Sequence, residues 1–256
     1  MDRLVLFDID CTLVDAHGAG GRAIMRAIRD VYGVEGDLGD YSFHGRTDPG
    51  IIRDLADLWG AGDPATVIGR YEGETQPQVI HELAERLGAP AATVDGLVDA
   101  CIARYVDLLH DEMAEVEVET LPGVRELVTA LAADRRVLLG LLTGNVEEGA
   151  RLKLQPTGLL GLFKVGAYGS DSALRSDLPA VAVGRAEALT GRRYAGKAIV
   201  VIGDTPADVE CGAGLGVKAI GVATGRHTME ELVRHAPDFL FPDLSDWRAA
   251  YEAVLA

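Results

Sequence analysis

The chain has 256 residues, of which 48% are hydrophobic, so it can bury a substantial core as one large domain or two unequal ones. A net charge of −16 excludes a general nucleic-acid surface, because a phosphate backbone requires a basic face. No apolar run approaches the roughly 18 residues of a membrane span, and the first residues lack a signal-peptide pattern. Three widely spaced cysteines favour reduced thiols over disulfides or a zinc site, so we expect a cytoplasmic protein.

The predicted elements begin with a buried strand at 4–7, which is followed by helices and not by another strand. Helical patterns then recur with turns between them, and the predicted helices are 21–32, 49–58, 64–87 and 94–109. No second strand is predicted before residue 137. Long structureless loops are uncommon in compact domains, so an inserted helical domain explains this gap better. We expect a helical cap domain at 17–116 and a core built from 1–16 and 117–256.

The second half of the chain alternates between short apolar runs and amphipathic segments. The predicted strands are 137–142, 163–168, 198–202, 218–222 and 239–241. The predicted helices are 123–133, 146–154, 179–189, 208–215, 229–235 and 247–255. Strands that alternate with helices indicate a parallel sheet covered on both faces. The fold class is therefore α/β, with a Rossmann-like parallel core and an inserted all-helical cap.

Polar residues follow several predicted strands, and the carboxyl ends of parallel strands form the ligand crevice of an open sheet. The candidate residues after the first four core strands are Asp8, Asp10 and Thr12; Thr143, Gly144 and Asn145; Arg175; and Asp204 and Asp208. Acidic clusters that offer only oxygen ligands suit a hard cation, most often Mg²⁺. The sequence therefore predicts a magnesium site with a polar surround at this edge.

The pair Asp8 and Asp10 fits phosphoryl transfer. Residues two apart in an extended stretch point the same way, so both carboxylates can address one substrate. The reaction requires a nucleophile, a proton donor for the leaving oxygen, and compensation for phosphoryl charge. Asp8 could attack phosphorus, and Asp10 could protonate the leaving alkoxide and then activate water. Thr143, with backbone N–H groups near a helix start, is a natural phosphate contact. The other residues at these strand ends that we expect to bind substrate are Thr12, Gly144 and Asn145.

Three motifs in this order carry a family resemblance: DIDCT at 8–12, the strand-ending Thr143, and GDTPAD at 203–208. The set resembles the haloacid dehalogenase (HAD) superfamily of phosphohydrolases, and it looks most like the phosphoglycolate phosphatase-type branch. The resemblance covers the whole chain in layout, including a helical cap inserted after the first motif. It implies a HAD-like core, an aspartyl-phosphate mechanism and a small phosphorylated metabolite as substrate.

The resemblance also implies roles for the acidic residues. Mg²⁺ would be held by Asp8, by the backbone carbonyl of Asp10, and by Asp204, with Asp208 binding directly or through water. One departure is Cys11, which stands where the family usually has glycine. No C-x5-R pattern follows any cysteine, so a thiol phosphatase is not expected.

The second departure concerns the phosphate-binding cation. Relatives carry a lysine, commonly in a Lys-Pro pair, on the loop after the third strand, and this chain has no such pair. Arg175 lies in the comparable loop and is the preferred residue. Lys153 is the alternative, although about ten helical residues would put it roughly 12–15 Å from the strand end.

Other interpretations remain open at this stage. Arg46 precedes a predicted helix, where it could clamp a second anionic group of the substrate or be a solvated surface charge. A sugar phosphomutase of the same fold would also use Asp8 and Asp10. A receiver-type signalling module also uses an acidic cluster, but its phosphorylated aspartate follows a later strand and it needs no cap. A non-catalytic binding protein would not need the intact aspartate pair.

Overall fold

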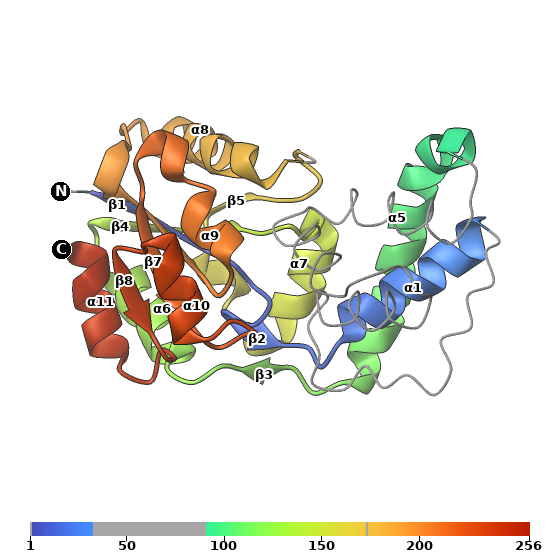
Figure 1. The fold of residues 1–256 in the computed structure, drawn as a ribbon, viewed down its shortest axis with the longest axis horizontal. Coiled ribbons are helices and arrows are strands. Elements are labelled where there is room, and N and C mark those ends of the chain that lie inside the picture. The colour runs from blue at the N-terminus through green and yellow to red at the C-terminus, as the bar shows by residue number, and fades with distance from the viewer. Residues whose placement is uncertain (1, 33–90, 173) are drawn as a thin grey trace.

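The computed structural model describes residues 2–32, 91–172 and 174–256. Within these residues six parallel strands form one sheet in the order β5-β4-β1-β6-β7-β8 (Figure 1). The strands are β1 (Arg3–Phe7), β4 (Val137–Leu142), β5 (Val165–Ala167), β6 (Ile199–Gly203), β7 (Lys218–Val222) and β8 (Phe239–Phe241). All six coincide with predicted strands, and the predicted α/β fold with a parallel core is confirmed.

Helices cover both faces of the sheet (Figure 1). Val5 and Phe7 of β1 join the core beneath α6 (Val124–Ala133) and α11 (Trp247–Leu255). Leu4 and Leu6 face the other way, into the core beneath α8 (Leu178–Thr190). These four apolar residues of β1 are fully buried, which explains the continuous apolar run, because a central parallel strand has no solvated face. Burying each such side chain contributes roughly 1.5–3 kcal/mol.

The remaining core helices are α7 (Glu147–Leu154), α9 (Pro206–Glu210) and α10 (Met229–Leu232). The helix predicted at 208–215 is wrong in extent, because α9 ends at Glu210 and a separate 3-10 turn follows. At Gly212 an added Cβ would lie 2.2 Å from the Val217 side chain, so the chain needs glycine for this close contact. The helix predicted at 229–235 likewise ends early, and a 3-10 turn continues to His235.

A small antiparallel ribbon joins the sheet region to the two described helices of the insertion. Its strands are β2 (Val14–Asp15) and β3 (Glu119–Thr120), and Val14 lies opposite Thr120. The prediction of no strand between 7 and 137 is therefore wrong. Strands of two residues have no readable periodicity, and these two pair across more than a hundred residues of chain.

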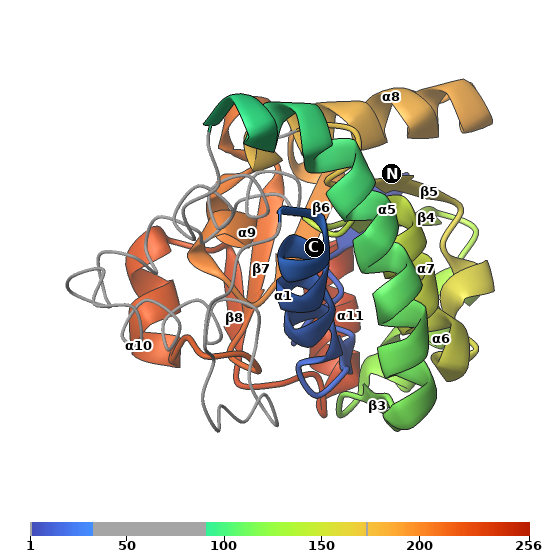
Figure 2. The ribbon, with the colours of Figure 1, turned by 90° about the vertical axis from the view of Figure 1, so that its right-hand side faces the viewer.

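Helices α1 (Ala19–Tyr32) and α5 (Ala91–Glu115) pack against each other beyond the carboxyl edge of the sheet (Figures 1 and 2). Arg22 Nε lies 2.5 Å from a Glu112 carboxylate oxygen, which ties the two helices together. The helices predicted at 49–58 and 64–87 lie outside the described residues, and the cap bounds of 17–116 stay a prediction. Within the described residues, no helix is both long and apolar enough to cross a membrane.

The turn before α6 generates a stability prediction. Gly123 has φ +75°, and an added Cβ would lie 1.6 Å from the Leu244 carbonyl oxygen. Gly123→Ala should therefore lower the free energy of unfolding by about 2 kcal/mol or more, through both strain and overlap. Denaturant unfolding measures the change. Gly184→Ala is the control, because its Cβ meets nothing within 4 Å; equal stability of the two variants would contradict the prediction.

Candidate active site

Three buried carboxylates meet at the carboxyl edge of the two central strands. Asp8 follows β1, Asp204 follows β6, and Asp208 lies in α9. These residues are 7%, 4% and 2% exposed, and one ligand oxygen from each lies within 4.8 Å of the others. The parallel register pairs Phe7 with Ile202, and Asp8 N donates to the Ile202 carbonyl at 2.9 Å. Pairing of β1 with β6 thus positions the nucleophile candidate beside the second acidic motif.

Side chains of two threonines hold the Asp208 and Asp204 carboxylates in place through hydrogen bonds. Thr205 caps α9: its backbone N–H and hydroxyl donate to Asp208 Oδ2 at 3.1 and 2.7 Å. This leaves Asp208 Oδ1 facing the cluster. The fully buried Thr12 hydroxyl donates to Asp204 Oδ1 at 3.0 Å. Thr12, predicted as a substrate contact, therefore lies against an acidic side chain.

Arg175 lies in this cluster, as its loop position predicted. Its Nη2 is 3.0 Å from Asp8 Oδ1 and also contacts Asp208 Oδ1. Burial, followed by repulsion from Asp208, raises the pKa of Asp8 to about 7 against the opposing effect of Arg175. Burial, followed by Asp208 and Asp8, also raises the pKa of Asp204 well above its ordinary value. One guanidinium does not offset three buried carboxylates.

The donor set fits a hard divalent cation. It consists of carboxylate oxygens that are buried, close together and short of positive charge. Such oxygen-only sets suit Mg²⁺. Asp8, Asp204 and Asp208 are the side chains that would hold it.

A second cluster surrounds Asp10. Lys153 Nζ donates to both Asp10 carboxylate oxygens at 2.7 and 2.8 Å and to Asn145 Oδ1 at 2.9 Å. Its side chain is only 1% exposed. The prediction that Lys153 falls roughly 12–15 Å away is wrong. Helix α7 begins only at Glu147, and helical side chains lean toward the N-terminal end, so the lysine stem reaches back to the strand edge.

The segment after β4 completes this cluster. Asn145 Nδ2 donates to Asp10 Oδ2 at 2.7 Å and to Thr143 Oγ1 at 2.8 Å. Thr143 is almost fully buried, and Gly144 is partly exposed between them. Asn145, predicted to bind substrate, thus joins Asp10, Thr143 and Lys153 in one hydrogen-bonded group. The predicted Arg46 lies outside the described residues.

Two residues after β7 were missed. Thr224 Oγ1 donates to the Cys11 carbonyl at 2.5 Å, which braces the turn after Asp10. Cys11 has φ 58°, a left-handed conformation that favours the glycine usual at this position. Gly225 leaves room for Asp204, because an added Cβ would lie 1.9 Å from Asp204 Oδ2. A search of the residues that follow β7, the fifth core strand along the chain, could have identified both, because β7 ends at the same edge of the sheet.

Comparisons with known proteins find similar sequences and a similar fold. The HAD-hydrolase-like family model matches residues 180–247. A phosphoglycolate phosphatase of Synechococcus elongatus is 29% identical over 130 residues, which are 50% of this chain and 57% of that protein. Pyrophosphatase PpaX of Bacillus pumilus is 25% identical over 181 residues, 70% of this chain and 79% of that protein. A hydrolase structure from Pseudomonas syringae covers 98% of both chains with a TM-score of 0.64 and 17% identity.

In its motifs, in the matched family model and in these relatives, the chain is similar to hydrolases of the haloacid dehalogenase superfamily. Within that superfamily, the similarity to a phosphoglycolate phosphatase agrees with the branch that the motifs resemble. The match to the first of these relatives spans a little over half of that protein's length. In the structure, Asp8, Asp10, Thr143 and Asp204 lie at strand ends in the order that the motifs predicted.

The buried charge cluster predicts how the metal-free protein responds to pH. The folded-state pKa of Asp8, about 7, lies above the ordinary value of 3.8, so the unfolded chain ionises first. Ionisation of Asp8 therefore removes stability as the pH rises from about 4 through about 7. At pH 8, without metal, Asp8→Asn should gain roughly 1 kcal/mol or more, since one pKa unit corresponds to about 1.4 kcal/mol.

Thermal unfolding in chelator measures this gain. Asp107→Asn, at an exposed position of α5, is the matched control and should change Tm little. Added Mg²⁺ should raise Tm of the wild type and much less that of Asp8→Asn. A metal-free Asp8→Asn protein that is less stable than the wild type would contradict the charge argument.

Gly225 generates a separate prediction. In Gly225→Ala the new Cβ must displace the Asp204 carboxylate, which Thr12 holds in place. The fold should survive, but the Mg²⁺ concentration needed for half of the Tm increase should rise about tenfold or more, as when a metal ligand is disturbed. Gly214→Ala is the control, because its Cβ meets nothing within 4 Å. Unchanged Mg²⁺ dependence in Gly225→Ala would refute the need for this glycine.

Proposed function

We propose that the protein is a Mg²⁺-dependent phosphatase that hydrolyses the phosphate monoester of a small metabolite through an aspartyl-phosphate on Asp8. The observation that carries the proposal is the pair Asp8 and Asp10 at one strand end, each contacted by its own cation. Arg175 contacts Asp8, and Lys153 contacts Asp10. The name of the phosphoglycolate phosphatase relative supports the same reaction class.

In the first half-reaction, an Asp8 carboxylate oxygen attacks phosphorus, and the bond from phosphorus to the alcohol oxygen breaks. Asp10, in its protonated form, gives its proton to that leaving oxygen. Thr143 and Arg175 contribute donors for the phosphoryl oxygens. Bound Mg²⁺ would supply further positive charge against those oxygens.

In the second half-reaction, the Asp10 carboxylate accepts a proton from water while the water oxygen attacks phosphorus. The bond from phosphorus to Asp8 breaks, which releases inorganic phosphate and restores the Asp8 carboxylate. The contacts of Asp10 with Lys153 and Asn145 suit its ionised state, after proton donation and before water activation. These two donors hold the base in orientation between the two steps.

Arg175 and Lys153 were alternatives for one phosphate-binding cation. We now assign each a separate role, Arg175 at Asp8 and Lys153 at Asp10. Arg175→Ala and Lys153→Ala should each lower kcat by roughly 10²–10³, the usual loss for one such donor. Arg175→Lys should recover part of the loss. Lys164→Ala, which removes an exposed lysine, is the control and should keep kcat. Steady-state kinetics measure these changes. A Lys153→Ala enzyme with the wild-type kcat would contradict the role of Lys153 at Asp10.

A panel of phosphorylated metabolites assayed with Mg²⁺ tests the function itself. We expect release of inorganic phosphate that chelator abolishes, that Mg²⁺ restores, and that a folded Asp8→Asn variant lacks. Calcium should fail to replace Mg²⁺, because its looser and larger coordination disturbs an in-line attack. Full activity in chelator would rule out the metal. Transfer of the phosphoryl group back to a sugar, dependent on a bisphosphate, would instead identify a phosphomutase.

A further inference from the structure

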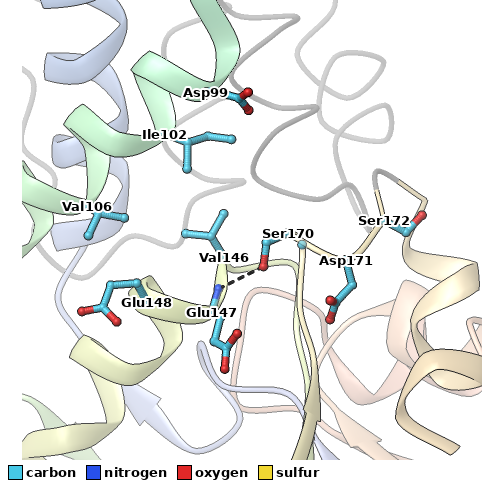
Figure 3. Close-up of a pocket in the computed structure, with 10 residues that line it drawn as sticks. Asp99, Ile102, Val106, Val146, Glu147, Glu148, Ser170, Asp171 and Ser172 are labelled. Atoms are coloured by element: carbon cyan, nitrogen blue, oxygen red, sulfur yellow. Dashed lines mark hydrogen bonds between the residues drawn. The ribbon is translucent and has the colours of Figure 1, made fainter. Parts of the chain in front are cut away.

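A cavity of about 580 Å³ lies between α5 and the core. This volume is typical of small-molecule pockets, which range from roughly 300 to 1,000 Å³. Its apolar lining comes from Ile102 and Val106 of α5 and from Val146, just before α7. Figure 3 shows these three side chains between Asp99 on one side and Glu147 and Asp171 on the other.

Part of the cavity lining directly follows the proposed catalytic segment along the chain. Val146 directly follows Asn145, which contacts Asp10, so one wall continues from the catalytic segment. The Gly169 N–H donates to the Asn145 carbonyl at 2.8 Å, which joins a second wall, residues 169–172, to the same segment. That second wall then continues along the chain to Arg175. A substrate with its phosphoryl group at Asp8 can therefore extend its alcohol part into this space.

The charges on the lining are negative. Four carboxylates border the cavity, and the lining residues that the structure describes include no basic side chain. Two of the four are offset: Glu148 pairs with Arg151, and Asp171 pairs with Arg185. Asp99 and Glu147 have no ion pair with any residue in the described ranges. Among the lining residues in the described ranges, a group inside the cavity therefore meets apolar walls and net negative charge.

We propose that this pocket binds the alcohol part of the substrate and favours phosphate monoesters of amino alcohols over those of hydroxy acids. The inference rests on the proposed phosphatase function. The apolar side chains accommodate a short carbon chain, and the acidic residues attract an ammonium group and repel a carboxylate. Selection would thus come from Asp99 and Glu147, which take no part in the chemistry at Asp8.

Three substrates of nearly equal size isolate the effect of charge: phosphoethanolamine, ethylene glycol monophosphate and phosphoglycolate. We expect kcat/KM to fall in that order. The selectivity ratio is kcat/KM for phosphoethanolamine divided by kcat/KM for phosphoglycolate. In the double variant Asp99→Asn/Glu147→Gln this ratio should fall roughly 3- to 30-fold, as expected for two partly solvated charges. Glu126→Gln, an exposed acid on α6, is the matched control and should keep the wild-type ratio. Raising the salt concentration from about 0.01 to about 1 M should also lower this kcat/KM ratio for the wild type, because the Debye length falls from about 30 to about 3 Å.

The outcomes separate the two proposals. If phosphoglycolate is hydrolysed at least as efficiently as phosphoethanolamine, the pocket inference is overturned while the phosphatase function stands. A double variant that keeps the wild-type ratio of kcat/KM values also overturns it, since Asp99 and Glu147 would then not determine which substrate is preferred. If neither these substrates nor a wider panel of monoesters releases phosphate with Mg²⁺, the proposed function fails and the inference fails with it.

Discussion

The cost of burying three carboxylates at one edge of a parallel sheet governs the rest of this structure. Asp8, Asp204 and Asp208 repel one another in a site with little water, and Arg175 alone does not offset their charge. Strong pairing of central strands, a capped helix and close glycine contacts are what keep the three together. The resulting shortage of positive charge favours the binding of a divalent cation, which would supply the positive charge that a phosphoryl group requires.

The order of strands makes this concentration possible. β1 lies between β4 and β6, so the residues that follow these three strands become neighbours although they are far apart in sequence. Asp8 and Asp10 then face two separate groups: a buried acidic cluster with Arg175, and a hydrogen-bonded cluster with Lys153 and Asn145. Two carboxylates in one motif thereby acquire different surroundings, as a nucleophile and an acid–base group require.

Strand positions and the acidic motifs could be predicted because apolar runs and strand-end aspartates are local signals. Lys153 was misjudged because its distance to Asp10 depends on where α7 begins and which way its side chain leans, neither of which spacing along the chain reveals. The β2–β3 ribbon was missed because two-residue strands carry no pattern. Gly225 was missed because its importance comes only from the carboxylate that lies against it in space.

The identity of the phosphorylated residue tests the central claim most directly. An Asp10→Asn variant should form the aspartyl-phosphate with an activated substrate but hydrolyse it slowly, because its base is missing. Mass spectrometry of the acid-quenched peptide that carries both positions locates the phosphoryl group. The mechanism predicts phosphate on Asp8 in the presence of Mg²⁺ and none in chelator. Phosphate on another residue, or wild-type turnover by Asp10→Asn with no phosphorylated peptide, would contradict it.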